Sequence, residues 1–260
     1  MQTETALNDL KVNQSPQLIL WPENASDIDP YLNSDVKNSL LDIASKANIP
    51  ILFGAVLDNG DSLSNAAVLA TDAKLETVYI KQKLVPFGEY LPFRNLLAPV
   101  ISRFDRLSRD FVAGSTAIPV AVNGSQINVL ICYEVAFDQV WRNTARESDL
   151  SLVITNNATY GETKQPIQQL RITQLQAIAA GRGVVVASTS GISAEISSAG
   201  QIKQIISENQ PGSIYAEIPQ HFNVAPSYYL QSVLHVLSVA LLSGLVLIRI
   251  RSSVRKKFTS

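Results

Sequence analysis

The sequence is poor in the residues that most often build disulfides and metal centres. It contains one cysteine, Cys132, and two histidines, His221 and His235, among 260 residues. A single cysteine excludes a disulfide within the chain. Neither histidine has a thiol or a group of carboxylates near it at the spacing of metal ligands. We therefore predict no metal and no other cofactor.

The chain also lacks an excess of charge of either sign. It carries 21 lysine and arginine residues against 22 aspartate and glutamate residues, which gives a formal net charge of -1. No stretch interleaves basic and aromatic residues as a surface for single-stranded nucleic acid would. Nucleic acid is therefore not expected as a partner. Hydrophobic residues make up 46% of the chain, enough to build the core of one large α/β domain.

Long apolar runs are absent until the C-terminus. Residues 230–248 form 19 positions without a formal charge, and at about 1.5 Å per residue such a helix is about 28 Å long, close to the thickness of a bilayer's hydrocarbon core. Basic residues follow at Arg249, Arg251, Arg255, Lys256 and Lys257. The pattern predicts a transmembrane helix at 228–250 and a basic cytoplasmic tail at 251–260, with the preceding domain on the external face of the cell membrane. The alternative is a buried amphipathic helix, because Gln231, His235 and several serines interrupt the run.

The rest of the chain alternates between helical and strand patterns. We expect a polar N-terminal segment at 1–16, without the apolar core of a signal peptide, and one domain at 17–220. Helices are predicted at 35–47, 135–147 and 165–181, and strands at 17–20, 49–56, 65–70, 76–81, 127–131, 150–155, 184–188, 192–196, 201–206 and 213–218. Residues 84–110 resist a regular assignment and are interpreted as a long functional loop. This alternation is typical of an α/β sheet fold.

Three polar residues of different chemistry stand at the ends of three predicted strands: Glu23, Lys81 and Cys132. Strand ends of an open α/β sheet converge on one rim, so these residues can meet. There a carboxylate could take the proton of a thiol nucleophile, and a lysine could stabilise the oxyanion that forms on the attacked carbonyl, which is the chemistry of acyl transfer. A helix N-terminus after the cysteine would lower its pKa. The alternatives are that Cys132 is a small buried hydrophobe and that the two charges lie on the surface.

The segments around these residues resemble a known family. Trp21-Pro22-Glu23, the run from Tyr79 to Tyr90 and the run from Ile131 to Glu134 are similar, in order, to the three catalytic segments of the carbon-nitrogen hydrolase (nitrilase) superfamily and, within it, of the apolipoprotein N-acyltransferases. The resemblance covers 18–218 and extends to residues 156–161 and 189–192. It implies a nitrilase-like αββα sandwich, followed here by the predicted C-terminal transmembrane helix.

The same resemblance implies roles for individual residues. Glu23 would be the general base, Lys81 would stabilise the tetrahedral intermediate, and Cys132 would carry a thioester. Supporting positions are implied at Glu89, Glu134, Tyr133, Trp21 and Asn65, of which Tyr133 and Trp21 would shape the approach of acyl chain or lipoprotein. The family spacing selects Lys81 rather than Lys83 as the catalytic lysine. Arg94 and Arg182 are expected at the surface.

The implied reaction moves a fatty acyl group from a phospholipid, through the cysteine thioester, to the N-terminal diacylglyceryl-cysteine of an apolipoprotein. Phospholipid, apolipoprotein and membrane are thus the expected partners. Members of the family carry several transmembrane helices ahead of this domain, and the nitrilase fold has a strand before the Trp-Pro-Glu strand. The resemblance therefore also implies an N-terminal truncation, with a separate chain as one possible source of the missing helices. Two other hypotheses stay open: a membrane-tethered amidase that acts on a small amide, and an inactive fragment that needs a membrane partner.

Overall fold

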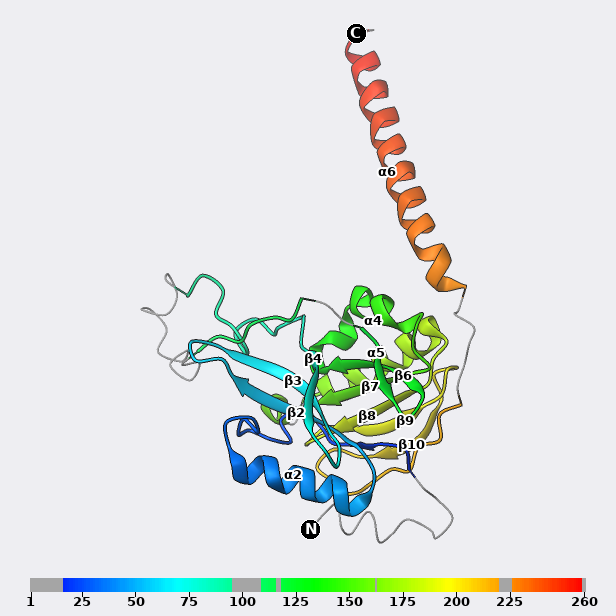
Figure 1. The fold of residues 1–260 in the computed structure, drawn as a ribbon. Helices are drawn as coiled ribbons and strands as arrows, with labels where there is room; N and C mark the ends of the chain where they lie inside the picture. Colours follow the sequence, from blue (N-terminus) through cyan, green and yellow to red (C-terminus); the bar gives the residue numbers. More distant parts are fainter. Residues whose placement is uncertain (1–15, 95–108, 116–117, 162, 220–225, 259–260) are drawn as a thin grey trace.

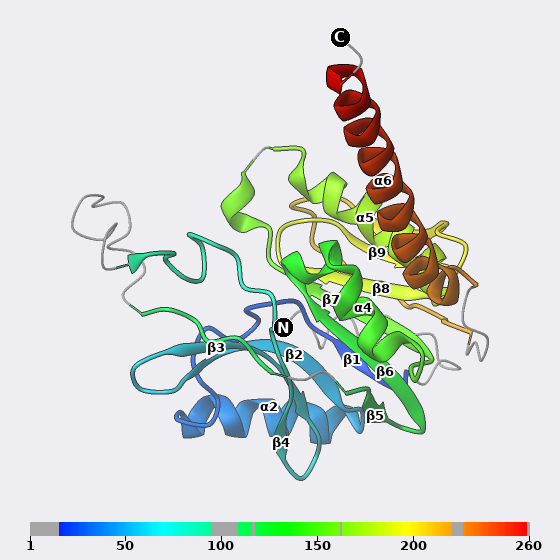
Figure 2. The same ribbon diagram turned by 90° about the horizontal axis from the view of Figure 1, so that it is seen from above.

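Two β-sheets pack face to face and carry helices on their outer faces, as Figures 1 and 2 show from two directions. The computed structural model describes residues 16–94, 109–115, 118–161, 163–219 and 226–258. One sheet has the order β1-β2-β3-β4, built from Ile19–Leu20, Ile51–Asp58, Leu63–Ala70 and Leu75–Ile80. The other has the order β10-β9-β8-β7-β6-β5, built from Ile202–Ile206, Ser193–Ile196, Val184–Ser188, Leu150–Thr155, Ser125–Ile131 and Val120–Val122.

Three apolar layers hold the sheets and helices together. Between the sheets, Leu52 and Leu69 pack with Val129 and Ile154. Helix α2 (Ser34–Ala47) covers the outer face of the four-stranded sheet, where Leu40 and Ala44 contact the core. Helices α4 (Asp138–Ala145) and α5 (Gln165–Ala180) cover the other sheet. The arrangement is an αββα sandwich, which confirms the predicted fold class.

The helices connect parallel strands, and this connection places strand ends on one rim. Helix α2 begins after Asn33, whose side chain accepts hydrogen bonds from the backbone N–H groups of Asp35 and Val36, a typical N-cap. It links β1 to its parallel neighbour β2. Strands β6, β7 and β8 are also parallel, with Ile131 opposite Ile154. The residues that follow these strands therefore lie side by side at the carboxyl ends of the strands.

The C-terminal residues form one long helix, α6 (Ser227–Phe258), which contacts α5 and extends away from the sandwich in Figure 1. Among the residues that the structure describes, no helix is both long enough and apolar enough to cross a membrane, so the span predicted at 228–250 is not supported. Serines at 238 and 243 interrupt the apolar stretch, and Arg249 ends it. The helix continues through the predicted boundary at 250, because lysine and arginine are good helix formers.

Three sequence-based assignments differ from the structure. Residues 213–218 form no strand; the carbonyl of Tyr215 accepts a hydrogen bond from the side-chain amide of Gln204 at 2.5 Å, in place of a ladder bond. The helix predicted at 135–147 is two pieces, the 3₁₀ helix η2 (Cys132–Ala136) and α4, separated by Phe137 in an extended conformation. Strand β5 was not predicted. Of the predicted loop, residues 84–93 contain no helix and only an isolated bridge between Pro86 and Tyr90; Arg94 is helical, and 95–108 lie outside the described residues.

Candidate active site

The structure brings Glu23, Lys81 and Cys132 to one buried site. Glu23 lies three residues beyond β1, Lys81 directly follows β4, and Cys132 directly follows β6. Their exposed fractions are only 4%, 1% and 5%. Lysine and glutamate are almost never buried to this extent unless they are paired. The site therefore contains charged groups that compensate each other, and the alternative of ordinary surface charges is wrong.

Lys81 stands between two carboxylates. Its Nζ lies 2.8 Å from Oε1 of Glu89 and 3.4 Å from Oε1 of Glu23. The side-chain amide of Asn65, on β3, donates to both of these oxygens, at 2.7 Å to Glu23 and 2.9 Å to Glu89. Both predicted supporting residues, Asn65 and Glu89, thus contact the central pair directly. The four side chains form one network in which an amide and an ammonium hold two carboxylates in fixed positions.

Charge keeps the lysine protonated in spite of its burial. Burial by itself would lower the pKa of Lys81, but Glu23, the ionised form of Cys132 and Glu89 outweigh it, and the pKa is raised above its ordinary value. Lys81 is therefore an ammonium at neutral pH. It can donate hydrogen bonds to an oxygen that gains negative charge, but it cannot act as a base.

Cys132 occupies a strained position at the start of η2. Its backbone φ is +52°, in the left-handed region that non-glycine residues seldom adopt. Burial raises the pKa of its thiol to about 11, and the charge of Glu23 adds to the shift, while Lys81 and a hydrogen bond with Thr155 oppose it. The expectation that a helix N-terminus lowers this pKa is wrong, because the five-residue 3₁₀ turn is outweighed by burial and a nearby carboxylate. The thiol is neutral at pH 7, so a nucleophilic attack requires a base.

Glu134 ties the cysteine turn to the segment that follows β4. It is completely buried, and its Oε2 accepts a hydrogen bond from the backbone N–H of Ile131 at 2.8 Å. Its Oε1 accepts from the Tyr79 hydroxyl at 2.8 Å and from the backbone N–H groups of Gln82 and Lys83 at 2.6 and 3.1 Å. Burial raises the pKa of Glu134, although these hydrogen bonds favour the charged form. Glu134 therefore fixes the position of the cysteine turn relative to the segment that follows β4.

The two aromatic residues predicted to shape the approach lie in different places. Tyr133 is 37% exposed and stacks edge-on against Phe137, with ring centroids 4.9 Å apart. Trp21 packs edge-on against Phe53, at 6.4 Å between centroids, among the apolar residues beneath α2. Trp21 thus contributes to the core of the four-stranded sheet and α2, whereas Tyr133 stands beside the cysteine with part of its ring in solvent.

Several further residues complete the site. The resemblance extended to residues 156–161 and 189–192 but assigned them no role, and Thr155 was not singled out from the sequence. Thr155 and Tyr160 form hydrogen bonds with Cys132, and burial together with the cysteine raises the pKa of Tyr160 to about 12. The backbone N–H of Asn156 donates to Oε2 of Glu23 at 2.6 Å, and the Thr189 hydroxyl donates to the carbonyl of Glu23 at 3.0 Å. Thr155 ends β7, and Thr189 directly follows β8. The rule that polar residues at the ends of parallel strands meet could have found both.

The two arginines expected at the surface behave differently. Arg94 has 35% of its side chain exposed and pairs with Asp110. Arg182 is only 1% exposed, and its Nε donates to the carbonyl of Ser148 at 2.7 Å. The surface expectation is therefore wrong for Arg182, because main-chain carbonyls, including that of Gly181 at 3.3 Å, satisfy its guanidinium inside the protein.

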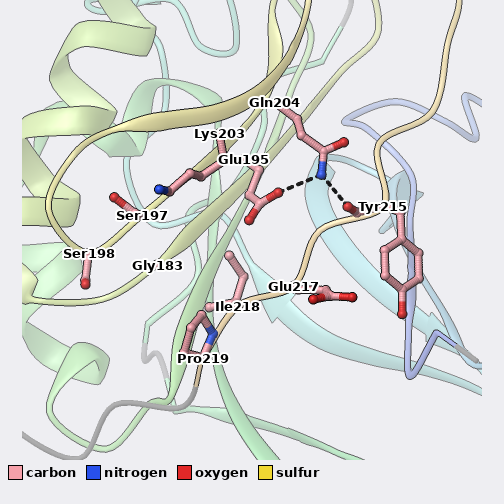
Figure 3. Close-up of a pocket in the computed structure, with 10 residues that line it drawn as sticks. All are labelled: Gly183, Glu195, Ser197, Ser198, Lys203, Gln204, Tyr215, Glu217, Ile218 and Pro219. Carbon is pink, nitrogen blue, oxygen red and sulfur yellow. Dashed lines mark hydrogen bonds between the residues drawn. The ribbon is translucent and has the colours of Figure 1, made fainter. Parts of the chain in front are cut away.

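The described residues form two cavities that bear on the site. One, of about 580 Å³, lies where residues 215–219 pass the end of the six-stranded sheet, and Figure 3 shows Gln204 pointing its amide toward both Glu195 and the carbonyl of Tyr215. None of the site residues described above lines it. The other, of about 500 Å³, lies beside the segment that follows Lys81, and its lining is Gln82, Lys83, Leu84, Tyr90, Asp110, Phe111, Ala113 and Phe137. Among the described residues, no group of three or more histidine, cysteine or acidic side chains could hold a metal ion.

Known proteins resemble this chain in sequence. Apolipoprotein N-acyltransferase from Pseudomonas aeruginosa is 31% identical over 240 residues, which are 90% of this chain and 46% of that protein. The enzyme of that name from Mycolicibacterium smegmatis is 34% identical over 258 residues, 93% of this chain and 43% of that protein. The chain thus spans about half the length of these curated relatives.

Solved structures resemble the sandwich at lower identity. An amidase from Nesterenkonia sp. AN1 has a TM-score of 0.59 at 22% identity, over 81% of this chain and 82% of that chain. A CN-hydrolase superfamily protein from Xanthomonas campestris has a TM-score of 0.59 at 19% identity, over 80% and 81%. The sequence model of the carbon-nitrogen hydrolase family matches residues 10–222. This chain therefore belongs to the carbon-nitrogen hydrolase family.

Proposed function

We propose that this domain transfers a fatty acyl group from a phospholipid to an amine through a thioester on Cys132. The observation that carries the proposal is the buried cluster in which the Lys81 ammonium bridges Glu23 and Glu89 beside the cysteine. Relatives named apolipoprotein N-acyltransferase support an apolipoprotein as acceptor, at the α-amino group of its N-terminal diacylglyceryl-cysteine.

The first half-reaction acylates the enzyme. Glu23 accepts the thiol proton as the sulfur of Cys132 attacks the ester carbonyl of the phospholipid, and the carbonyl electrons move onto oxygen. The ammonium of Lys81 donates a hydrogen bond to this oxyanion. When the intermediate collapses, the carbon-oxygen bond of the ester breaks, the lysophospholipid leaves as an alcohol with the proton held by Glu23, and a thioester remains on the enzyme.

The second half-reaction uses the same groups. The acceptor amine attacks the thioester carbonyl, Glu23 takes a proton from the attacking nitrogen, and Lys81 again stabilises the oxyanion. The carbon-sulfur bond then breaks, the thiolate of Cys132 takes the proton back from Glu23, and the amide product leaves. Asn65, Glu89 and Glu134 act as positioning residues, because each holds a reacting group or its backbone through hydrogen bonds.

Helix α6 would bring the domain to the lipid. Large apolar side chains along it are more than half exposed, including Leu234 at 57%, Leu237 at 58%, Leu241 at 66% and Leu245 at 55%. An exposed apolar helix that ends in arginine and lysine residues is expected to bind a membrane surface that contains anionic lipid. The predicted location of the catalytic domain, on the external face of the membrane, belongs to this same proposal.

The test is to incubate the purified protein with phospholipid vesicles and to look for an acyl adduct by mass spectrometry of the peptide that contains Cys132. The expected adduct is one fatty acyl group, removed by hydroxylamine and absent from Cys132→Ala. A diacylglyceryl-cysteine peptide should then discharge the adduct and appear as the N-acyl product. Absence of the adduct would contradict the proposal. Hydrolysis of short amides without any lipid adduct would favour the amidase hypothesis instead.

A further inference from the structure

The cavity of about 500 Å³ is lined by residues that adjoin the catalytic cluster in the chain. Two of its lining residues, Gln82 and Lys83, are the next residues after Lys81, and Phe137 on its wall stacks with Tyr133, the residue after the cysteine. Glu134 fixes both the Gln82 and Lys83 backbones to the cysteine turn. A molecule bound in this cavity would therefore contact the residues that follow the catalytic lysine. Its volume falls in the range of small-molecule sites, about 300–1,000 Å³.

Lys83 gives this cavity a positive charge that no carboxylate of the described residues neutralises. Its Nζ lies over the ring of Phe137, 5.8 Å from the centroid, and the lysine forms no ion pair with any residue that the structure describes. The one acidic residue of the lining, Asp110, is paired with Arg94, and that pairing lowers the pKa of Asp110. The free charge of the lining is therefore that of Lys83.

Gln82 adds a second donor without an acceptor. Its Nε2 is buried and has no hydrogen-bond partner in the described part of the chain. The Tyr79 hydroxyl interacts with this side chain, but it donates its own proton to Glu134 at 2.8 Å. A buried amide donor that lacks an acceptor costs about 1–3 kcal/mol. The unpaired ammonium of Lys83 on the cavity wall, together with the unsatisfied amide of Gln82 buried beside it, indicates an acceptor-rich, anionic ligand.

We propose that Lys83 and Gln82 bind the phosphate of the phospholipid acyl donor, with the aromatic wall of Tyr90, Phe111 and Phe137 against its glycerol and proximal acyl carbons. The proposal rests on the proposed acyl transfer, because it assigns the donor's position within that reaction. Lys83 is then a specificity residue for phosphate-bearing donors, whereas Lys81 stabilises the oxyanion. Free phosphate has the same chemistry, so the experiment separates the two sources.

The first measurement compares two acyl donors on the wild-type protein, Lys83→Met and Gln82→Glu. Phosphatidylglycerol vesicles supply a phosphate-bearing donor, and a p-nitrophenyl acyl ester supplies an uncharged one. The ratio of the Cys132 acylation rate with phosphatidylglycerol to the rate with the p-nitrophenyl ester should fall about 10- to 100-fold in Lys83→Met. This is the factor expected for one hydrogen bond to a charged group. The same ratio should also fall in Gln82→Glu, which replaces the amide hydrogen-bond donor of residue 82 by a carboxylate. Lys203→Met, in the cavity of Figure 3, is the control and should leave the ratio unchanged.

The second measurement does not depend on acyl transfer. Binding of short-chain phosphatidylglycerol to Cys132→Ala is measured by calorimetry, with and without Lys83→Met, and with inorganic phosphate as competitor. We expect Lys83→Met to weaken binding about 10- to 100-fold, and inorganic phosphate to compete only at far higher concentration than the lipid. Equally effective competition would assign the site to free phosphate and overturn the lipid proposal.

The outcomes separate the two proposals. If the wild-type protein acylates with neither donor but Lys83→Met weakens lipid binding, the proposed function fails and the phosphate site stands. If Lys83→Met lowers both acylation rates equally and leaves lipid binding unchanged, Lys83 only stabilises the segment that follows β4, and the phosphate site is refuted. An unchanged ratio together with unchanged binding refutes it as well.

Discussion

Replacing Glu23 with glutamine is expected to move two properties of Cys132 in opposite directions. The carboxylate is the proposed base, and general-base catalysis contributes about 10²–10⁴ in rate. Acylation of Glu23→Gln should therefore fall by that factor, which corresponds to about 3–5 kcal/mol in the barrier. The same carboxylate helps to raise the thiol pKa to about 11, so its removal should lower that pKa and make the free thiol more reactive.

The size of the second effect follows from thiol chemistry. With a pKa of about 11, about 0.1% of the thiol is ionised at pH 8. Each unit by which the pKa falls gives about ten times more thiolate, but each thiolate is about a third as nucleophilic, so alkylation gains about three- to fourfold per unit. Iodoacetamide labelling of Cys132 at pH 8 should therefore speed up in the variant while acylation from vesicles slows.

Glu195→Gln is the matched control for Glu23→Gln. Glu195 is also buried, at 7% exposed, and also accepts a hydrogen bond from a side-chain amide, that of Gln204 at 2.9 Å. It lines the other cavity and should change neither rate. The reasoning is refuted if Glu23→Gln retains acylation within about tenfold of wild type, or if its alkylation slows together with its acylation while circular dichroism shows an intact fold.

Three other predictions test the fold and the site. The rate of iodoacetamide labelling of Cys132 should rise with pH to a midpoint near 11. Because folding raises the pKa of this thiol, the free energy of unfolding, measured with urea, should fall as the pH rises above the ordinary thiol value of 9.0. Gly54→Ala would place a Cβ 2.5 Å from Cα of Glu23, and should cost about 1–3 kcal/mol of stability and reduce acylation; wild-type acylation would contradict this close approach. Arg182→Met should cost about 2–4 kcal/mol, because it leaves buried carbonyls without a donor, whereas Arg94→Met should cost less than about 1 kcal/mol in the same urea titration.

Regular elements with a strong pattern could be predicted from the sequence. The strands at Leu150–Thr155 and Val184–Ser188 have the predicted bounds, because continuous β-branched runs bounded by polar or glycine-containing turns leave little choice. Helix α5 was predicted from residue 165 and ends where Gly181 adopts a left-handed conformation. Residues 213–218 have an equally strong strand pattern but form no strand. A strand needs a neighbouring strand to pair with, and strand propensity alone does not provide one.

At the site, too, some features follow from the sequence and others only from the tertiary structure. The sequence by itself determined that a lone cysteine, a glutamate and a lysine stand at three strand ends, because residue order and apolar runs are local properties. Only the tertiary structure decided that the amide of Asn65 joins Glu23 to Glu89, that Glu134 fastens the cysteine turn to the segment after β4, and that Trp21 turns into the core. It also decided the state of the thiol, since the local turn predicts a low pKa and burial beside a carboxylate produces a high one. Burial and through-space charge depend on segments distant in the chain, and no local pattern of residues encodes them.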